Sequence, residues 1–251
     1  MEARRKRMVE LIRQEGEVSI ARLKECFSDV SEMTLRRDLE FLDRNKQIVR
    51  VYGGAKSIGA VVGLSEEVYA KRSRDNVEEK NLIAKKALRL LQPNMSVFVD
   101  SGSTTTALTH IMPDKEFLIY TSGITCAVEL ARLSKSTVYL LGGELSRNSL
   151  STQGSQPARE IECVNFDIAF LGVTGFTLGK GFTTGLSDDC RLKRTVIDRT
   201  REIVVLMDSS KIGKVLPYTF AQLDQIDTVV VDEKIDPDIV QRLEDAEVRV
   251  I

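Results

Sequence analysis

The sequence contains no tryptophan, a single histidine and only four cysteines, and none of its apolar runs is long enough to span a bilayer. Cys26, Cys126, Cys163 and Cys190 lie far apart without a CxxC pair, and His110 stands alone, so these residues fit neither a zinc site nor a dense disulfide framework. We therefore expect reduced thiols, no metal site and no cofactor. The opening run "MEARRKRMVELIRQEG" is charged throughout and lacks the apolar core of a secretory signal. The expected location is the cytoplasm.

Charge is distributed unevenly along the 251 residues, although the formal net charge is only -1. Residues 1–60 contain 13 Lys and Arg against 10 Asp and Glu, a balance of +3, whereas the remainder contains 23 against 27, a balance of -4. The length suggests one large domain or two ordinary ones. The basic N-terminal quarter points to nucleic acid as a partner of that part of the chain.

The first sixty residues carry three helical patterns followed by a hairpin pattern. The predicted elements are helices over residues 3–14, 18–27 and 32–45 and a small β-hairpin over 47–55. In the third helix, Leu35, Leu39 and Leu42 form a buried stripe, and either Asp29 or Ser31 serves as the N-cap. Three helices followed by a hairpin make a winged helix-turn-helix, whose third helix enters the major groove of DNA.

Residues near the start of that third helix are candidates for DNA contact, because a hydroxyl and two guanidinium groups can supply both phosphate contacts and base readout. The candidate DNA-binding residues are Ser31, Met33, Thr34, Arg36, Arg37, Arg50 and Tyr52. The alternative is that the arginines only form salt bridges with Glu32, Asp38 or Glu40 on the helix surface. Two features favour DNA binding: this helix is the third of a three-helix unit, and a basic N-terminus precedes it.

The run "VSEMTLRRDLEFLDRNKQIVRVYGGA" resembles the helix-turn-helix signature of the DeoR family of bacterial transcription regulators. The matching pattern is S-x-x-T-[IL]-R-R-D-L followed by R-x-[HY]-G-G-A, and Tyr52 stands where histidine is frequent. The resemblance implies a winged helix-turn-helix DNA-binding domain over residues 1–57.

Beyond a linker expected at residues 58–75, apolar strand patterns alternate with helical ones. The predicted strands cover residues 96–100, 116–122, 137–143, 166–172, 202–208, 228–233 and 248–251. The predicted helices cover residues 77–91, 104–112, 124–134, 155–162, 187–200 and 236–245. This alternation predicts a Rossmann-like α/β domain over residues 76–251, with a mostly parallel sheet covered by helices on both faces.

Glycines, hydroxyl-bearing residues and a few charged residues follow the predicted strands, where ligands of open parallel sheets bind. The stretch "DSGSTTTAL", residues 100–108, carries hydroxyls on five of the six residues from Ser101 to Thr106. Threonine forms helices poorly, but hydroxyls and backbone N–H groups at a helix N-terminus suit a phosphate. The candidate strand-end residues are Asp100, Ser101, Gly102, Ser103, Thr104, Thr105, Ser122, Gly123, Gly143, Gly172, Asp208 and Lys211. Any one of these strand-end turns could be an ordinary surface turn. Glycine-rich and hydroxyl-rich turns after five different strands together favour an anion site.

This part also resembles the DeoR-type sensor domain over residues 76–231, through "DSGSTTTAL", "YTSG", "LLGGELSRNSLSTQGS", "DIAFLGVTGF", "GFTT", "DDCRLKR" and "DSSKIGK". That domain is similar in fold to ribose-5-phosphate isomerase and to sugar-phosphate deaminases. The resemblance implies that Lys193 and Lys211 bind the anion or carbonyl end of a phosphorylated sugar. Asp189 stands where glutamate is usual, and Thr174 stands where aspartate is frequent.

A catalytic carboxylate pair is missing from the pattern. Isomerisation of an aldose needs a base, normally a carboxylate with a tuned pKa. Asp100, Asp188, Asp189 and Asp208 are available, but none belongs to a paired motif like the isomerase D-G-A-D, whose place is taken by "LGVTG". We therefore assign no catalytic residue and expect the phosphate to be sensed without being transformed.

These observations predict a transcription regulator, most simply a repressor of a sugar-metabolism operon. The expected partners are double-stranded operator DNA, a phosphorylated sugar that modulates operator affinity, and further copies of the chain in a homodimer or homotetramer. One alternative is a sugar-phosphate isomerase or deaminase with a DNA-binding appendage. Another is a winged-helix protein whose C-terminal half serves only for oligomerisation.

Overall fold

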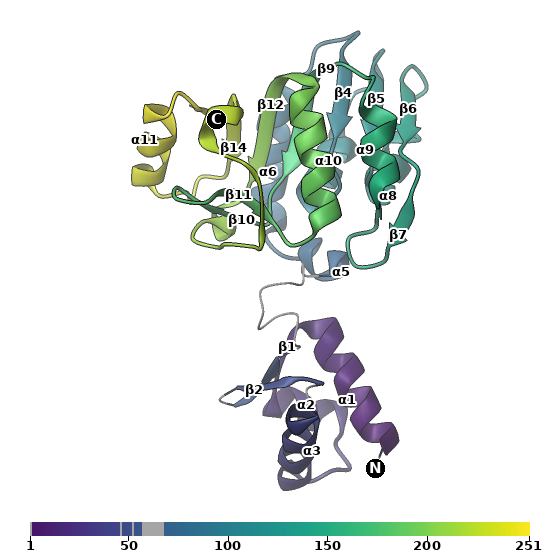
Figure 1. Ribbon diagram of the computed structural model, residues 1–251, viewed down its shortest axis with the longest axis vertical. Coiled ribbons are helices and arrows are strands. Elements are labelled where there is room, and N and C mark those ends of the chain that lie inside the picture. Colours follow the sequence, from purple (N-terminus) through teal and green to yellow (C-terminus); the bar gives the residue numbers. More distant parts are fainter. Residues whose placement is uncertain (1, 46, 52, 57–67) are drawn as a thin grey trace. The chain divides into compact units, whose positions relative to one another are not determined.

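The chain divides into two compact units, Met1–Val68 and Tyr69–Ile251, in the computed structural model (Figure 1). The structure describes residues 2–45, 47–51, 53–56 and 68–251, with the backbone alone at residues 2, 3, 13 and 14. Most of the expected linker lies outside these ranges. Its last residues, from Tyr69 onward, belong to the second unit and include the short helix α5 (Tyr69–Arg72). No described helix is long and apolar enough to cross a membrane.

The first unit combines three helices with a small antiparallel sheet. Its elements are α1 (Glu2–Glu15), β1 (Glu17–Ser19), α2 (Ile20–Cys26), α3 (Glu32–Arg44), β2 (Val49–Val51) and β3 (Gly54–Lys56). Met8 of α1, Leu23 of α2 and the predicted stripe of Leu35, Leu39 and Leu42 are all almost fully buried in one core. The unit is the expected winged helix-turn-helix.

One short strand replaces the start of the predicted second helix. Val18 and Ser19 lie in β1, which pairs with β3 in the order β1-β3-β2 and so adds a third strand to the predicted hairpin. Gly54 permits this pairing, because a Cβ there would lie only 2.2 Å from the carbonyl oxygen of Val18. The helix begins at Ile20, where the Ser19 hydroxyl accepts a hydrogen bond from the Arg22 amide at 3.1 Å.

The second unit is built on a seven-stranded parallel sheet. Its strands are β4 (Ser96–Val99), β5 (Leu118–Thr121), β6 (Thr137–Leu140), β9 (Phe166–Gly172), β12 (Thr200–Met207), β14 (Thr228–Val231) and β15 (Arg249–Val250). They lie in the order β15-β14-β12-β9-β4-β5-β6, and each falls within or close to a predicted strand. The chain runs outward from β4 through β5 to β6 and then crosses to β9, on the other side of β4. The topological switch point therefore lies between β4 and β9.

Helices cover both faces of this sheet, as the alternating pattern predicts (Figure 1). The elements are α6 (Val77–Leu88), α7 (Ser103–Ile111) and α8 (Ile124–Leu130) on one face, α9 (Ser155–Ile161) and α10 (Ser187–Asp198) on the other, and α11 (Pro237–Asp245) before β15. Successive residues of each strand serve opposite layers: Val97 and Val99 pack under α6–α8, and Phe98 packs on the α9–α10 side.

Several short elements were not predicted from the sequence. They are the hairpin β7 (Glu144–Ser146) and β8 (Ser151–Gln153), the small sheet of β10 (Gly175–Thr177), β11 (Gly181–Thr184) and β13 (Tyr218–Ala221), and the 3-10 turns η1 (Ser209–Lys211) and η2 (Leu223–Gln225). None of these strands lies in a long apolar run like those of the parallel sheet, so their sequences gave no strand signal. Phe176, Phe182 and Phe220 anchor the small sheet in the core on the α10 side.

Candidate functional site

The N-terminal turn of α3 presents the predicted DNA-contacting side chains. Ser31 caps the helix, because its hydroxyl accepts the Thr34 amide at 3.2 Å and lies 2.9 Å from the Thr34 hydroxyl. Met33 is 65% exposed, which is unusual for a methionine and leaves it available to a partner. Arg37 is exposed and forms no hydrogen bond or ion pair with any residue that the structure describes. Its guanidinium group is therefore unengaged.

The other candidate DNA-binding residues of this unit differ in the contacts that they form within the protein. Arg36 forms an i,i+4 ion pair with Glu32 at 2.6 Å, and whether it also contacts DNA stays a prediction. Arg50 is exposed on β2, and its backbone amide donates to the Asp43 carboxylate at 3.2 Å. Tyr52 lies outside the described residues.

Asp38 forms a salt-bridge network that the sequence did not predict. Its carboxylate is only 2% exposed and pairs with Arg4 at 2.6 Å and with Arg5 at 2.7 Å, both on α1. The Arg5 guanidinium also lies 3.8 Å from the centre of the Phe41 ring. Two of the basic residues that suggested a DNA-binding N-terminus therefore fasten α1 to α3. The pairing joins residues more than thirty positions apart, so helix periodicity gave no signal for it.

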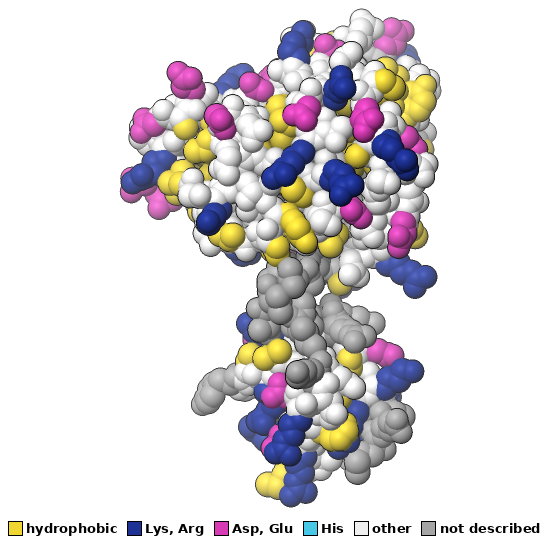
Figure 2. Space-filling model, in the orientation of Figure 1, with side chains coloured by type: hydrophobic (Ala, Val, Ile, Leu, Met, Phe, Trp, Pro, Cys, Tyr) yellow, Lys and Arg dark blue, Asp and Glu magenta, His cyan; other side chains and the backbone are white. Residues whose placement is uncertain are grey.

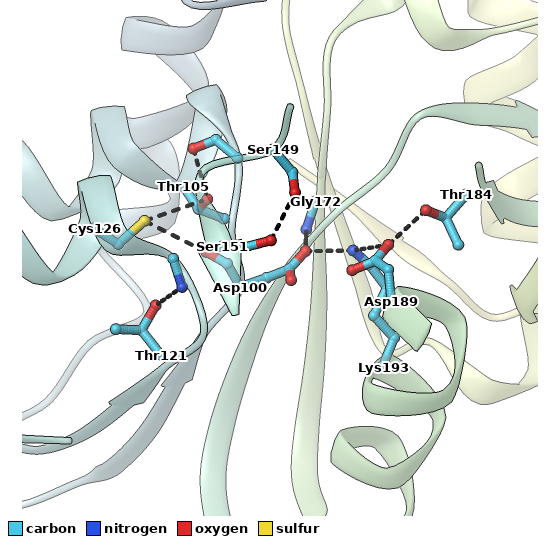
Figure 3. Close-up of polar contacts among 12 residues, drawn as sticks. Asp100, Thr105, Thr121, Cys126, Ser149, Ser151, Gly172, Thr184, Asp189 and Lys193 are labelled. Carbon is cyan, nitrogen blue, oxygen red and sulfur yellow. Dashed lines mark hydrogen bonds and ion pairs between the residues drawn. The ribbon is translucent and has the colours of Figure 1, made fainter. Parts of the chain in front are cut away.

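In the second unit, a buried acid–base cluster lies at the switch point of the sheet (Figure 3). Asp100 follows β4 and is fully buried, and its Oδ2 accepts hydrogen bonds from the Gly172 amide at 2.9 Å and from Lys193 at 2.5 Å. Lys193 comes from α10 and is also 3.1 Å from Asp189, one turn earlier. Thr184 of β11 donates to Asp189 at 2.5 Å. A continuous chain of polar contacts thus joins β4, β9, α10 and β11.

The cluster contains two carboxylates, Asp100 and Asp189, against one ammonium group, Lys193, so acidic groups outnumber basic ones. Lys193 is buried between two carboxylates that compensate its charge, and its contact with the anion or carbonyl end of a phosphorylated sugar stays a prediction. Burial raises the pKa of Asp100 to about 6, and the charge of Asp189 adds to this, while Lys193 opposes it. The second oxygen, Asp100 Oδ1, is buried without a hydrogen-bond partner among the described residues. It remains an acceptor for a hydroxyl.

The turn from β4 into α7 keeps its backbone donors free. Gly102 is the N-cap of α7, with φ +150° and no side chain that could cover the helix end. The Thr105 and Thr106 hydroxyls both donate to the Gly102 carbonyl, at 3.0 and 2.7 Å, so they brace the turn. Thr105 is fully buried, and the donors that remain are the backbone N–H groups of the first turn and the hydroxyls of Ser103 and Thr104.

The next turn, from β5 into α8, lies against the first. A Cβ on Gly123 would come within 3.0 Å of the Ser101 Cα, so glycine permits this close approach. Ser122 is buried, and its carbonyl accepts the amide of Thr152 from β8 at 2.8 Å. The hairpin β7–β8 therefore belongs to the site, although the sequence contributed only Gly143 from this region.

Three serines of that hairpin region were missed. Ser146, Ser149 and Ser151 are buried and joined by hydroxyl contacts of 2.6 and 2.7 Å. The signal for them was the serine spacing in "SRNSLS". Gly143 follows β6, two strands from β4, and a Cβ on it would lie 2.6 Å from the Gln153 carbonyl oxygen. Its place in the effector site stays a prediction.

A second carboxylate, Asp208, follows β12 on the same edge of the sheet. Its Oδ1 accepts the Ser210 amide at 3.1 Å and the Asn76 side chain at 3.1 Å. Its Oδ2 is buried without a hydrogen bond among the described residues, with Lys211 Nζ at 3.7 Å. Lys211 is mostly buried and points its charge toward this carboxylate. The described parts of the chain hold no cluster of three metal-ligating side chains.

Comparisons with known proteins agree with both units. Residues 4–61 match the DeoR-like helix-turn-helix domain, and residues 75–233 match the DeoR C terminal sensor domain. The HTH-type transcriptional regulator GlpR of Haloferax volcanii is 32% identical over 99% of this chain and 96% of its own. The HTH-type transcriptional repressor GlcR of Bacillus subtilis is 30% identical over 81% of this chain and 78% of its own. A ribose 5-phosphate isomerase from Methanocaldococcus jannaschii aligns with 56% of each chain at 17% identity and a TM-score of 0.41.

Proposed function

The chain belongs to the DeoR family of transcription regulators, and we propose that it is a repressor whose affinity for its operator is lowered by a phosphorylated sugar. The observation that carries the sugar part is a pair of buried carboxylate oxygens at the carboxyl edge of the sheet, Asp100 Oδ1 and Asp208 Oδ2, that accept no hydrogen bond from any described residue. Buried acceptors of this kind need donors, and the hydroxyl groups of a sugar supply them.

The phosphate has a separate place in this proposal. The uncovered N–H groups at the start of α7, next to Gly102, form a positive helix end without a competing side-chain cap. A ligand that places a phosphate there and its hydroxyls toward Asp100 uses both halves of the site. The acidic cluster disfavours a second anionic group, so the ligand is a monophosphate of a neutral sugar.

Thermal unfolding with a ligand panel tests this assignment. Ribose 5-phosphate, glucose 6-phosphate, fructose 6-phosphate and fructose 1-phosphate are compared with the same sugars without phosphate. A ligand at about one hundred times its Kd stabilises the folded state by about 2.7 kcal/mol, which raises Tm measurably. Stabilisation by phosphorylated sugars alone supports the proposal. Equal shifts with the free sugars, or no shift with any member of a widened panel, would contradict it.

The proposal assigns binding without turnover. Burial raises the pKa of Asp100 to about 6, but its Oδ2 already accepts hydrogen bonds from Gly172 and Lys193, which leaves Oδ1 as the oxygen that a ligand can reach. The neighbouring carboxylate, Asp189, is itself held by Lys193 and Thr184. Incubation with ribose 5-phosphate, followed by NMR, should show no ketose above the uncatalysed level. Formation of the ketose would instead support the isomerase alternative.

Replacement of Arg37 tests directly whether the third helix recognises operator DNA. Replacing Arg37 with alanine should weaken operator binding by about 1–3 kcal/mol, because a guanidinium group that reads a base edge is lost and no fold contact is lost with it. The measurement is a gel-shift titration at fixed salt with operator DNA selected from random duplexes. Arg44→Ala, at the exposed C-terminal end of the same helix, is the matched control and should leave the affinity unchanged. Equal losses in both variants would remove Arg37 from the reading surface.

We propose further that the chain binds DNA as a symmetric oligomer, since two half-sites supply the specificity that one winged helix lacks. The edge strand β6 favours association. Tyr139 and Leu140 are 48% and 47% exposed on it, and residues 137–143 carry no charge that would oppose strand pairing. Figure 2 shows hydrophobic side chains gathered over β5 and β6.

A charge on that edge should dissociate the oligomer. Leu140→Lys places an ammonium group on the strand edge, and we expect a smaller species by light scattering at micromolar concentration, with operator affinity reduced about tenfold or more. Val215→Lys, at another exposed apolar side chain, is the control and should change neither quantity. An unchanged mass for the Leu140 variant would place the interface elsewhere.

A further inference from the structure

Residues 69–76, which begin the second unit, lie directly against the proposed effector site. The amide of Tyr69 donates to the Asn148 carbonyl of the β7–β8 hairpin region at 2.7 Å. The Tyr69 hydroxyl donates to Thr106 Oγ1 at 3.1 Å, and Thr106 in turn donates to the Gly102 carbonyl at 2.7 Å. Two hydrogen bonds therefore separate the start of this segment from the N-cap of the proposed phosphate site.

The end of the same segment touches the other half of the site. Asn76 is the N-cap of α6 and has a left-handed backbone, with φ +52°. Its side-chain amide donates to Asp208 Oδ1 at 3.1 Å and to Ser210 Oγ at 3.0 Å. The carboxylate that we assign to a sugar hydroxyl is thus also the acceptor that holds Asn76.

A buried lysine fixes the segment as one piece. Lys80 is 4% exposed, and its ammonium group donates to the carbonyls of Arg72 and Asp75, the latter at 2.5 Å. Burial lowers the pKa of Lys80, while the nearby Asp208 charge opposes that shift. Lys80 thus holds the backbone carbonyls of Arg72 and Asp75 at a fixed distance from each other. Because the middle of the segment is held in this way, we expect a displacement of Tyr69 or Asn76 to move the whole segment.

We propose that residues 69–76 form a transmission segment that reports effector occupancy to the DNA-binding unit. This inference rests on the proposed function. A phosphate at the α7 N-terminus lies beside Gly102, which is linked to Tyr69 through Thr106, and a hydroxyl on Asp208 acts on the carboxylate that holds Asn76. The segment continues into the chain that carries the winged helix, so a change in its hold biases the arrangement of the DNA-binding units. Such coupling is reciprocal: operator DNA weakens effector binding by the same factor.

Two conservative variants remove the side-chain hydrogen bonds that hold the segment and leave the effector-binding residues unchanged. Tyr69→Phe deletes one hydroxyl, and Asn76→Gly deletes the side-chain amide while glycine keeps the left-handed backbone. The probe is the panel sugar phosphate that releases the operator most strongly from the wild-type protein. We expect both variants to bind this probe with wild-type affinity by calorimetry. The ratio of operator Kd values with and without the probe should fall about fivefold or more.

Matched controls carry the same chemical changes elsewhere. Tyr120→Phe removes a half-buried hydroxyl from β5 that has no hydrogen bond among the described residues, and Asn94→Gly removes an exposed amide at φ +67°. Both should keep the wild-type ratio. If the Tyr69 and Asn76 variants also keep it, the transmission segment is wrong although the sensor assignment stands. If no panel member releases the operator from the wild-type protein, the proposed function fails first.

Hydrogen exchange of the DNA-free protein gives an independent readout. Adding the probe should change the exchange rate of the Tyr69 amide, whose acceptor is the Asn148 carbonyl, and of the Lys80 amide, which bonds to Asn76. Tyr69→Phe should reduce that response. Protection confined to the α7 turn, with unchanged exchange over residues 69–80, would overturn the inference.

Discussion

Replacing Lys193 with methionine should lower the free energy of unfolding by about 3–5 kcal/mol at pH 8, because it leaves a buried carboxylate without its cation. Asp100 is fully buried and accepts a hydrogen bond from Lys193, and Asp189 shares the same ammonium group. Methionine keeps the length and apolar character of the lysine side chain, so packing against the neighbouring Phe220 ring is preserved. The effect therefore reports charge and not volume.

The loss should depend on pH with a defined sign. The folded-state pKa of Asp100 is already raised, from 3.8 to about 6, and loss of the lysine raises it further. A carboxyl whose pKa is raised on folding stabilises the fold below its unfolded-state pKa, and that contribution is lost as the pH increases through the folded-state pKa. Urea denaturation should therefore show a small deficit near pH 4 and the full deficit at pH 8.

Two further variants make the test specific. Lys193→Met combined with Asp100→Asn should recover a large part of the lost stability at pH 8, since the unpaired charge is gone. Lys85→Met, on the exposed face of α6, should have little effect at any pH. A deficit that is equal at pH 4 and pH 8 would show that Lys193 acts through packing alone.

Replacing Gly102 with valine should reduce effector affinity by about a hundredfold or more, because about two hydrogen bonds to a charged group are lost, each worth about 1.5–3 kcal/mol. The side chain would lie where the phosphate must approach the free N–H groups of α7, and the backbone at φ +150° is unfavourable for valine. Operator affinity without effector should stay at the wild-type level. The cellular result is a promoter that remains shut in the presence of inducer.

Backbone strain has to be separated from the loss of binding. Gly154→Val introduces the same residue at another glycine N-cap, with φ +95° and open space around it, and it controls for strain. Thr106→Ala is a second comparison: its hydroxyl braces the turn and holds Tyr69, so effector binding by calorimetry should stay near the wild-type level while operator release weakens. If the Gly102 and Gly154 variants show the same effector midpoint by operator release, the phosphate does not bind at α7.

The sequence predicted the architecture well where burial dictates the pattern. Strands that are buried on both faces, such as residues 166–172 and 228–231, read as continuous apolar runs, and the helix with Leu35, Leu39 and Leu42 showed its stripe directly. β1 was missed because its three residues directly precede the apolar helical pattern of Ile20, Leu23 and Phe27, with no turn signal between them. The resemblance helped most with the site, because it selected Lys193 from a helix that strand-end reasoning does not reach.

The chemistry of the site was harder to predict than its location. Lys193 was expected to bind the anion or carbonyl end of a sugar phosphate, but its position between Asp100 and Asp189 was not foreseen, because only the packing of α10 against the strand ends determines it. Likewise, no local pattern shows that Tyr69 reaches Thr106 or that Asp38 reaches α1. Contacts between residues far apart in sequence depend on the folded arrangement, whereas strand ends and helix caps are local features.

The pairing of Arg4 and Arg5 with Asp38 bears on the ionic-strength dependence of DNA binding. Each phosphate neutralised by a free basic side chain releases condensed counterions, and the number of such contacts sets how steeply log K falls with log[salt]. Arginines already neutralised by a buried aspartate contribute little to that release. The slope should therefore be shallower than the basic residues of the first seven positions suggest, and the protein should keep more of its operator affinity as salt increases.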